Sequence, residues 1–188
     1  NAEYRQNPEI TYREALAFKE RMDYPGSKTS LTYIASGTAK LSYDNTSTNP
    51  NTQIVATDEN YMYTGGFELA EGRNFNLDDV YSGRNYTILG SETKTTLFDQ
   101  ESAVGKNIRI KGKPYLVIGV LAEKGSSGMF SGDRGAWVTM NYARANFSGG
   151  RPNYILSLNA PNAETLEAVQ GQSFSLMRSV RKLVPKER

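Results

Sequence analysis

The sequence predicts an α+β fold of two subdomains, one built from both chain ends and a β-rich one built from the middle. Three observations predict it: a helical pattern near each end, and a strongly apolar hairpin from Val104 to Glu123 between them. A chain of 188 residues has room for one ordinary domain or two small ones. We therefore expect residues 1–84 and 151–188 to form one subdomain and residues 85–150 the other.

The hairpin in the middle of the chain is the most clearly marked β-structure. Residues 107–111 alternate apolar and polar side chains, as a half-buried strand does. Gly112 and Lys113 supply a tight turn, because glycine adopts the positive φ that short hairpins need. Tyr115–Leu121 is an almost unbroken apolar run, which favours a strand covered on both faces. Pro114 cannot donate a ladder hydrogen bond, so we place it first in this second strand.

The N-terminal segment predicts a helix from Ile10 to Met22. Thr11 and Glu14 form a T-x-x-E capping box, in which each side chain satisfies an amide of the first turn. Pro25-Gly26 ends the helix.

The middle of the chain carries several shorter elements. We expect strands at 31–34, 39–43 and 53–57, with the polar tract 44–52 as a hairpin loop between the last two. A short helix over Ser91–Phe98 is expected to be capped by its first serine. Further candidates are helices at 60–66 and 141–147 and strands at 86–89, 136–140 and 154–158.

The last predicted element is the longest helix. Asn162 is a good N-cap, and Pro185 ends the helix. Cationic side chains lie near its C-terminal end, where the helix dipole favours them. One apolar stripe runs along it at three- and four-residue steps, formed by Leu166, Val169, Ser173, Leu176, Met177, Val180 and Val184.

Composition excludes several classes of protein. Lysine and arginine total 22 against 20 acidic residues, a net charge of +2, which provides no field strong enough to indicate binding to nucleic acid or to an anionic membrane surface. The chain has no cysteine and no histidine, so a disulfide scaffold and a thiolate zinc site are excluded. No apolar run is long enough to span a bilayer. The first residue is Asn1, not Met, which suggests a chain cut from something longer.

The residues indicate a protein that is not an enzyme. A serine or threonine nucleophile usually needs a neighbouring base, most often histidine, and this chain has none. Asp78 and Asp79 could ligate a hard cation, but a solvated helix start is the favoured interpretation. We therefore expect no catalytic, cofactor-binding or metal-binding residue.

The glycine- and serine-rich loop Gly125–Gly135 has two interpretations. The favoured one is a mobile connection, because lone apolar residues in loops often fold back onto their own domain. The alternative is an adhesive tip for a partner protein, formed by Met129 and Phe130 with Asp133 beside them. A phosphate-binding loop is not indicated, because the required spacing is missing and a strand follows.

The segment from Glu71 to Phe75 also has two interpretations. Arg73 could bind the carboxylate of a ligand. The favoured interpretation is structural: Gly72 allows a tight turn, Arg73 pairs locally and Phe75 anchors the segment in the core.

The order of several segments resembles the extracytoplasmic core domain of MacB-like, FtsX-like ABC transporter permeases. The resemblance covers most of the chain from Tyr61 onward. The matching segments are Glu71–Phe75 with Asp78-Asp79 after it, Thr87–Glu92, Leu97-Phe98, Val104–Lys106, the hairpin IRIKGKPYLVIGVLAEKG and the closing LMRSVRKLVPK. Four further glycines within these segments are expected to be structural: Gly90, Gly105, Gly112 and Gly119.

The resemblance implies a function that the residues alone do not show. Family members have four membrane helices, with this domain inserted between the first two on the periplasmic face of the inner membrane. They dimerise, and a cytoplasmic ATPase subunit or domain drives movement of the outer domain, which acts on a periplasmic substrate. The domain divides into a Porter subdomain from both chain ends and a β-rich Sabre subdomain from the middle. MacB itself also contacts a periplasmic adaptor.

One departure from the family pattern concerns the C-terminus. A strand usually follows the final helix, whereas this chain stops at Arg188, so the Porter sheet is expected to lack an edge strand.

Two hypotheses from other classes remain beside the permease domain. A secreted ligand- or glycan-binding module would bind a glycan saturably without catalysis. An enzyme with an oxygen-ligand metal site would lose activity when Asp78 and Asp79 are both replaced by alanine.

Overall fold

The structure is a computed structural model that describes residues 9–125, 132–147, 149 and 151–183. A ten-stranded mixed sheet runs through it in the order β10-β1-β4-β9-β6-β8-β7-β2-β3, with β5 paired to β8. The strands are β1 (Thr29–Ala39), β2 (Leu41–Tyr43), β3 (Thr46–Ser47), β4 (Thr52–Thr57), β5 (Leu69–Gly72), β6 (Tyr86–Leu89), β7 (Asn107–Ile110), β8 (Lys113–Leu121), β9 (Ala136–Thr139) and β10 (Ile155–Leu158).

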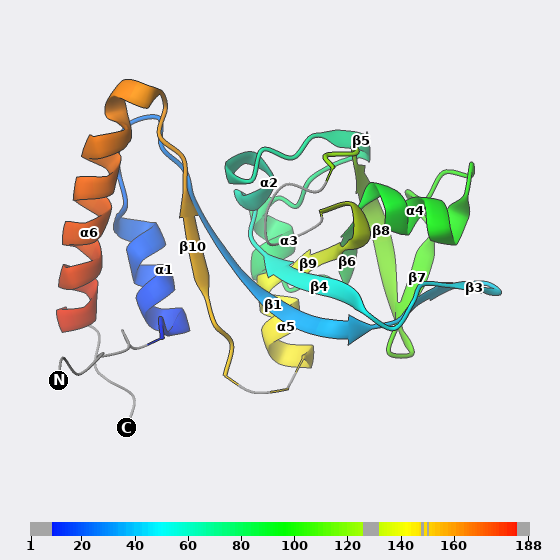
Figure 1. The fold of residues 1–188 in the computed structure, drawn as a ribbon. Coiled ribbons are helices and arrows are strands. Elements are labelled where there is room, and N and C mark those ends of the chain that lie inside the picture. The colour runs from blue at the N-terminus through cyan, green and yellow to red at the C-terminus, as the bar shows by residue number, and fades with distance from the viewer. Residues whose placement is uncertain (1–8, 126–131, 148, 150, 184–188) are drawn as a thin grey trace, which may run out of the picture.

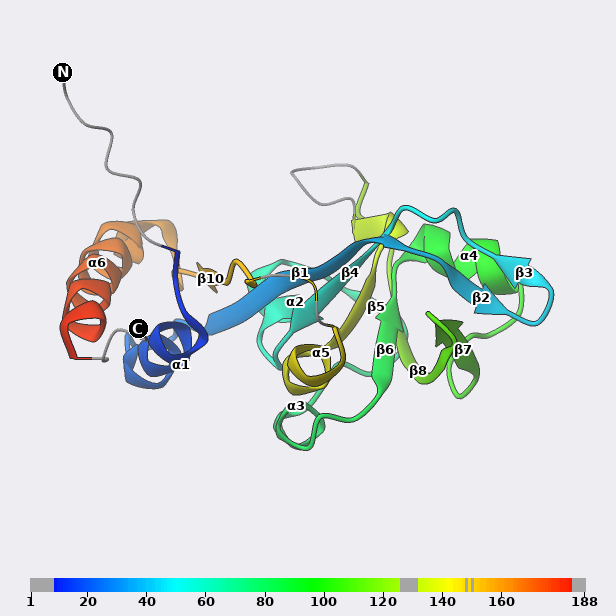
Figure 2. The same ribbon diagram turned by 90° about the horizontal axis from the view of Figure 1, so that it is seen from below.

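Helices lie at both ends of the sheet and against its face (Figures 1 and 2). They are α1 (Tyr12–Arg21), α2 (Tyr61–Thr64), α3 (Leu77–Tyr81), α4 (Ser91–Phe98), α5 (Met140–Asn146) and α6 (Leu166–Leu183), with 3-10 turns η1 (Gly132–Arg134) and η2 (Ala163–Thr165). The predicted α+β class is confirmed. The residue boundaries expected for the two subdomains stay a prediction, and β1 continues from the α1–α6 end into the far part of the sheet.

The predicted start of α1 is confirmed. The Glu14 amide donates to Thr11 Oγ1 at 3.2 Å, and the Thr11 amide donates to Glu14 Oε2 at 3.1 Å. Ala15 and Phe18 form the buried side of the helix.

The β7–β8 hairpin is confirmed, but its turn lies one residue earlier than predicted. Ile110 pairs with Lys113, so Lys111 and Gly112 are the two turn residues. Their φ values are 51° and 78°, the double positive φ of a type I′ turn. Pro114 is therefore the second residue of β8, not the first. The apolar run after it is buried between β6 on one side and β5 and β7 on the other.

The predicted pairing around the polar tract 44–52 is wrong. β2 pairs with β3 and β7, whereas β4 pairs with β1 and β9, so β2 and β4 are not a hairpin. The strand predicted at 31–34 is the first half of the 11-residue β1. The cap of α4 is also corrected: Gly90 occupies the N-cap, and Ser91 is the first helical residue.

α1 and α6 lie side by side and antiparallel beside the β10 edge of the sheet (Figures 1 and 2). Asn162 caps η2, which leads directly into α6. Phe18, Val169 and Val180 are buried here but lie outside the main hydrophobic cluster. The α1–α6 layer therefore has a small core of its own.

Candidate functional site

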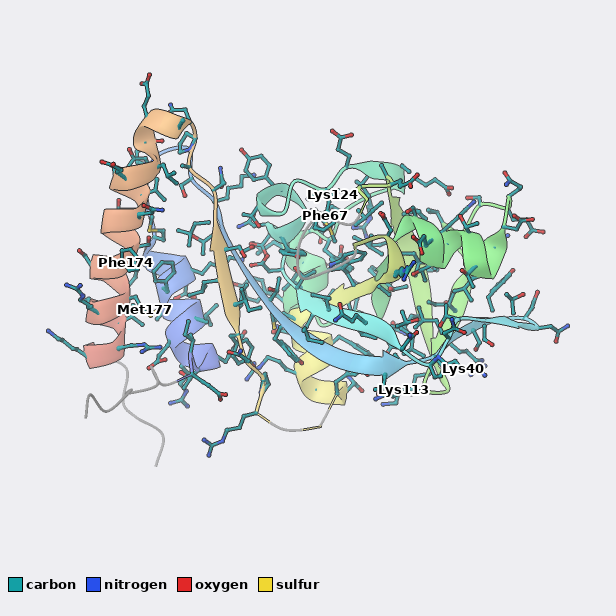
Figure 3. All side chains as sticks on the ribbon, viewed as in Figure 1. Lys40, Phe67, Lys113, Lys124, Phe174 and Met177 are labelled. Carbon is teal, nitrogen blue, oxygen red and sulfur yellow. The ribbon has the colours of Figure 1, made fainter. Side chains whose placement is uncertain are left out.

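Hydrogen bonds and a cation–ring contact hold the two ends of the loop Gly125–Gly135. Asp133 is 4% exposed, and its carboxylate accepts the Lys124 and Gly125 amides at 2.9 Å each. The Lys124 ammonium donates to the Gly65 carbonyl and lies 4.3 Å from the centre of the Phe67 ring (Figure 3). Asp133 is thus engaged within its own chain. Met129 and Phe130 lie outside the described residues, and their role in partner binding stays a prediction.

Phe67 connects this network to the main core. Its ring packs edge-on against Trp137 at 5.5 Å between centroids and tilts against Tyr61 at 5.7 Å. A Cβ atom on Gly132 would lie 2.5 Å from the Phe67 ring, so only glycine allows this close approach. The residues at the base of the loop are therefore packed on the core through Phe67.

The side chains of the segment from Glu71 to Phe75 make contacts within the chain. Arg73 Nη1 donates to Asp79 Oδ2 at 2.6 Å, and Phe75 is buried in the core. Burial alone would raise the pKa of the Asp79 carboxyl, but the bonds from Arg73 and the Asn76 amide outweigh burial and lower this pKa. Glu71 accepts a hydrogen bond from Ser102 Oγ at 2.9 Å. Asp79 is thus engaged by Arg73 and by the cap of α3.

The predicted structural glycines fall into two groups. At Gly72, Gly90 and Gly119 a Cβ atom would lie 2.0–2.6 Å from a backbone carbonyl oxygen of a neighbouring segment. Gly105 and Gly112 instead have positive φ values of 86° and 78° with open space around them. The first group lets chain segments touch, and the second allows turns.

A buried ionic group that the sequence did not indicate joins α1 to the sheet. Asp58, directly after β4, accepts Lys19 Nζ at 2.8 Å and the Leu31 amide at 2.8 Å. Lys19 also reaches Glu59 at 2.6 Å. Burial raises the pKa of Asp58, and Lys19 offsets this only partly. Burial lowers the pKa of Lys19, but Asp58 and Glu59 outweigh it and raise this pKa.

The same group forms the polar wall of a small pocket between α1, α3 and α5. Its volume is about 130 Å³, and its apolar wall includes Leu16, Leu77, Val80 and Met140. No local sequence pattern indicates it, because the pocket residues come from segments far apart in the chain.

Among the described residues, no group of three or more histidine, cysteine, aspartate or glutamate side chains could hold a metal ion. Within the same residues, no helix has the length and apolar character needed to cross a membrane.

Sequence comparison relates the chain to export permeases. It is 31% identical over 74 residues to the macrolide export ATP-binding/permease protein MacB of Chromobacterium violaceum, covering 39% of this chain and 12% of that protein. It is 34% identical over 93 residues to the pyoverdine export ATP-binding/permease protein PvdT of Pseudomonas aeruginosa, covering 47% of this chain and 14% of that protein. The chain thus spans a small part of these curated relatives.

Structural comparison shows the same fold in solved extracytoplasmic domains. The extracellular domain of the ABC-type transporter YknZ from Gram-positive bacteria matches with a TM-score of 0.67 at 21% identity, covering 94% of this chain and 87% of that one. The periplasmic region of MacB from Actinobacillus actinomycetemcomitans matches with a TM-score of 0.66 at 20% identity, covering 93% and 77%. A family model of the MacB-like periplasmic core domain matches residues 2–173. The chain therefore belongs to the family of MacB-like periplasmic core domains.

Proposed function

We propose that this chain relays ATP-driven movement from a cytoplasmic ATPase subunit or domain to a substrate in the periplasm. It does so as the outer domain of a dimeric MacB/FtsX-type permease, in efflux with a periplasmic adaptor. The observation that carries the proposal is the placement of two helix ends: the first turn of α1 and the last turn of α6 lie at the same end of the molecule (Figures 1 and 2). Two membrane helices attached there would enter the lipid from one side.

The continuous strand β1 supports the relay. It extends over 11 residues from the α1–α6 layer into the far part of the sheet, with β10 and β4 hydrogen-bonded to its two edges. The Lys19–Asp58 ion pair fastens α1 to the start of this strand through the Leu31 amide. A displacement of the helical end would therefore be carried by hydrogen-bonded backbone to the opposite end.

The adaptor contact is assigned to the loop Gly125–Asp133. The Asp133 anchor, the Lys124 contacts and the close approach of Gly132 to Phe67 support this assignment, because they hold both sides of the loop on a packed base. A partner that presses on such a loop would act on the sheet beneath it.

The test uses the full-length permease with its ATPase in membrane vesicles. Residues 126–131 are replaced by a glycine-serine segment of equal length, which keeps Asp133 and removes Met129 and Phe130. We expect substrate transport to fall by about tenfold while ATP hydrolysis continues. A tenfold fall corresponds to about 1.4 kcal/mol of binding free energy, which the loss of one interface anchor can remove.

Replacement of residues 48–51 in the β3–β4 turn by the same type of segment is the control, and it should leave transport intact. Unchanged transport by the 126–131 variant would remove the loop from the proposal. Loss of ATP hydrolysis together with transport would indicate a folding or assembly defect instead.

A further inference from the structure

A basic hollow lies at the end of the sheet opposite α6, between the β2–β3 turn and the β7–β8 turn. Its volume is about 390 Å³. Its lining carries three cations, Lys40, Arg109 and Lys111, and one carboxylate, Asp44. The rest of its lining is polar or backbone, including Ser42 and Ser47.

Strand register places Lys40 and Arg109 on one outer face. Leu41 pairs with Ile110 and Ser42 with Arg109 across β2 and β7. Leu41 and Ile110 are buried, so the alternating positions next to them face outward. Lys40, two residues before Ser42, therefore shares the outer face with Arg109, and Figure 3 shows Lys40 just beyond the end of β1.

The charge of this hollow is not balanced within the described part of the chain. There, none of the three cations has a carboxylate oxygen within 4 Å. Arg109 Nη1 donates to the Gly112 carbonyl at 2.9 Å, and Lys111 Nζ lies 5.5 Å from the Phe147 ring. Like charges on neighbouring strands repel, and an anionic ligand would relieve this repulsion.

The spacing of the cations matches an extended chain better than a single small anion. Diagonal positions on neighbouring strands, such as Lys40 and Arg109, are about 7–8 Å apart at their Cα atoms. Alternate side chains of an extended peptide are about 7 Å apart, so carboxylates at every second residue match this interval. Hydroxyl groups from Ser42 and Ser47 add donors to the lining.

We propose that the basic hollow docks an extended acidic segment of a partner protein. A lipid surface is less favoured, because the hollow lies at the opposite end of the sheet from the helices where membrane segments would attach. This inference rests on the proposed function in one respect only: the identification of the adaptor as the protein that carries the acidic segment.

The experiment measures binding of a fluorescent nine-residue peptide with glutamate at every second position and serine between. The protein is the 188-residue chain. The variant combines Lys40→Gln, Arg109→Gln and Lys111→Asn, since asparagine tolerates the positive φ of residue 111. We expect its affinity to fall by about tenfold at low salt, and the affinity of the unaltered chain to fall similarly when salt is raised.

Matched controls separate the site from overall charge. Arg151→Gln, Arg178→Gln and Lys182→Gln together also remove three positive charges, but from outside the hollow. They should change the affinity for the peptide by less than about twofold. Asp44→Asn removes the one opposing carboxylate and should tighten binding by about twofold.

Several outcomes would overturn the inference. Equal loss of binding in both triple variants would show non-specific attraction, and equal binding of the glutamine version of the peptide would exclude charge recognition. The peptide is also titrated while amide NMR signals of the hollow are recorded. If inorganic phosphate at the same concentration as the peptide shifts the same signals, the hollow is a small-anion site. Binding of the hollow to anionic lipid vesicles in place of the peptide would indicate a membrane contact. None of these results depends on transport, so they do not test the relay itself.

Discussion

At the scale of single residues, Gly72 shows how one missing side chain lets two segments touch. Its φ is +72°, and a Cβ atom there would lie 2.0 Å from the Ile118 carbonyl oxygen of β8. The Arg73 amide donates to that same oxygen at 2.9 Å. Gly72 therefore permits the contact that brings Arg73 and Phe75 into place.

We expect Gly72→Ala to destabilise the protein by about 3 kcal/mol or more, because it adds a backbone clash to the cost of positive φ. Gly112→Ala is the matched control, since Gly112 has a similar φ of +78° but open space around it. It should cost about 1–2 kcal/mol. Urea unfolding followed by the fluorescence of Trp137 measures both, and equal losses would contradict the role of the close contact.

At the scale of elements, α6 separates an inward from an outward face. Val180 is 0% exposed, whereas Phe174 is 67% exposed (Figure 3). We expect Val180→Ala to cost about 2 kcal/mol, because it removes buried methyl groups and leaves a cavity. Phe174→Ala removes a larger side chain and should cost less than about 0.5 kcal/mol. Thermal unfolding monitored by far-UV circular dichroism compares them, and a larger loss at Phe174 would disprove the assigned face.

The elements that the sequence predicted best are those whose signals are local. The Thr11–Glu14 capping box and the apolar run of β8 both lie within a few neighbouring residues. The length of β1 was missed because its outer half, around Ser36 and Thr38, is polar and partly exposed. Its partner β4 follows only after the short strands β2 and β3, and no local pattern indicates that β1 pairs with a strand beyond them.

The candidate sites were harder to predict, for the same physical reason. Lys40 and Arg109 become neighbours only through the register of β2 with β7. Alternation in residues 107–111 indicates that Arg109 faces outward, but not which residue lies beside it. The Lys19–Asp58 pair likewise joins residues from α1 and from the end of β4. The family resemblance supplied the fold and a function, and it did not indicate either contact.

At the scale of the whole molecule, the core is unevenly distributed. The main hydrophobic cluster is formed largely by side chains of β1, β4, β6, β7, β8 and β9, whereas α6 is held by the small set of buried residues at its contact with α1. We expect amide hydrogens of α6 to exchange faster than those of β8, because fewer buried contacts resist local opening there. Hydrogen–deuterium exchange read by mass spectrometry tests this. Equal protection of α6 and β8 would mean that the molecule opens only as one unit.

The pairing of β1 with β10 also has a consequence for folding during synthesis. Thr29 lies opposite Leu158, so β1 is synthesised well before its partner on this edge exists. A nascent chain that stops before Ile155 leaves β1 with an open edge, the type of edge on which chains associate wrongly.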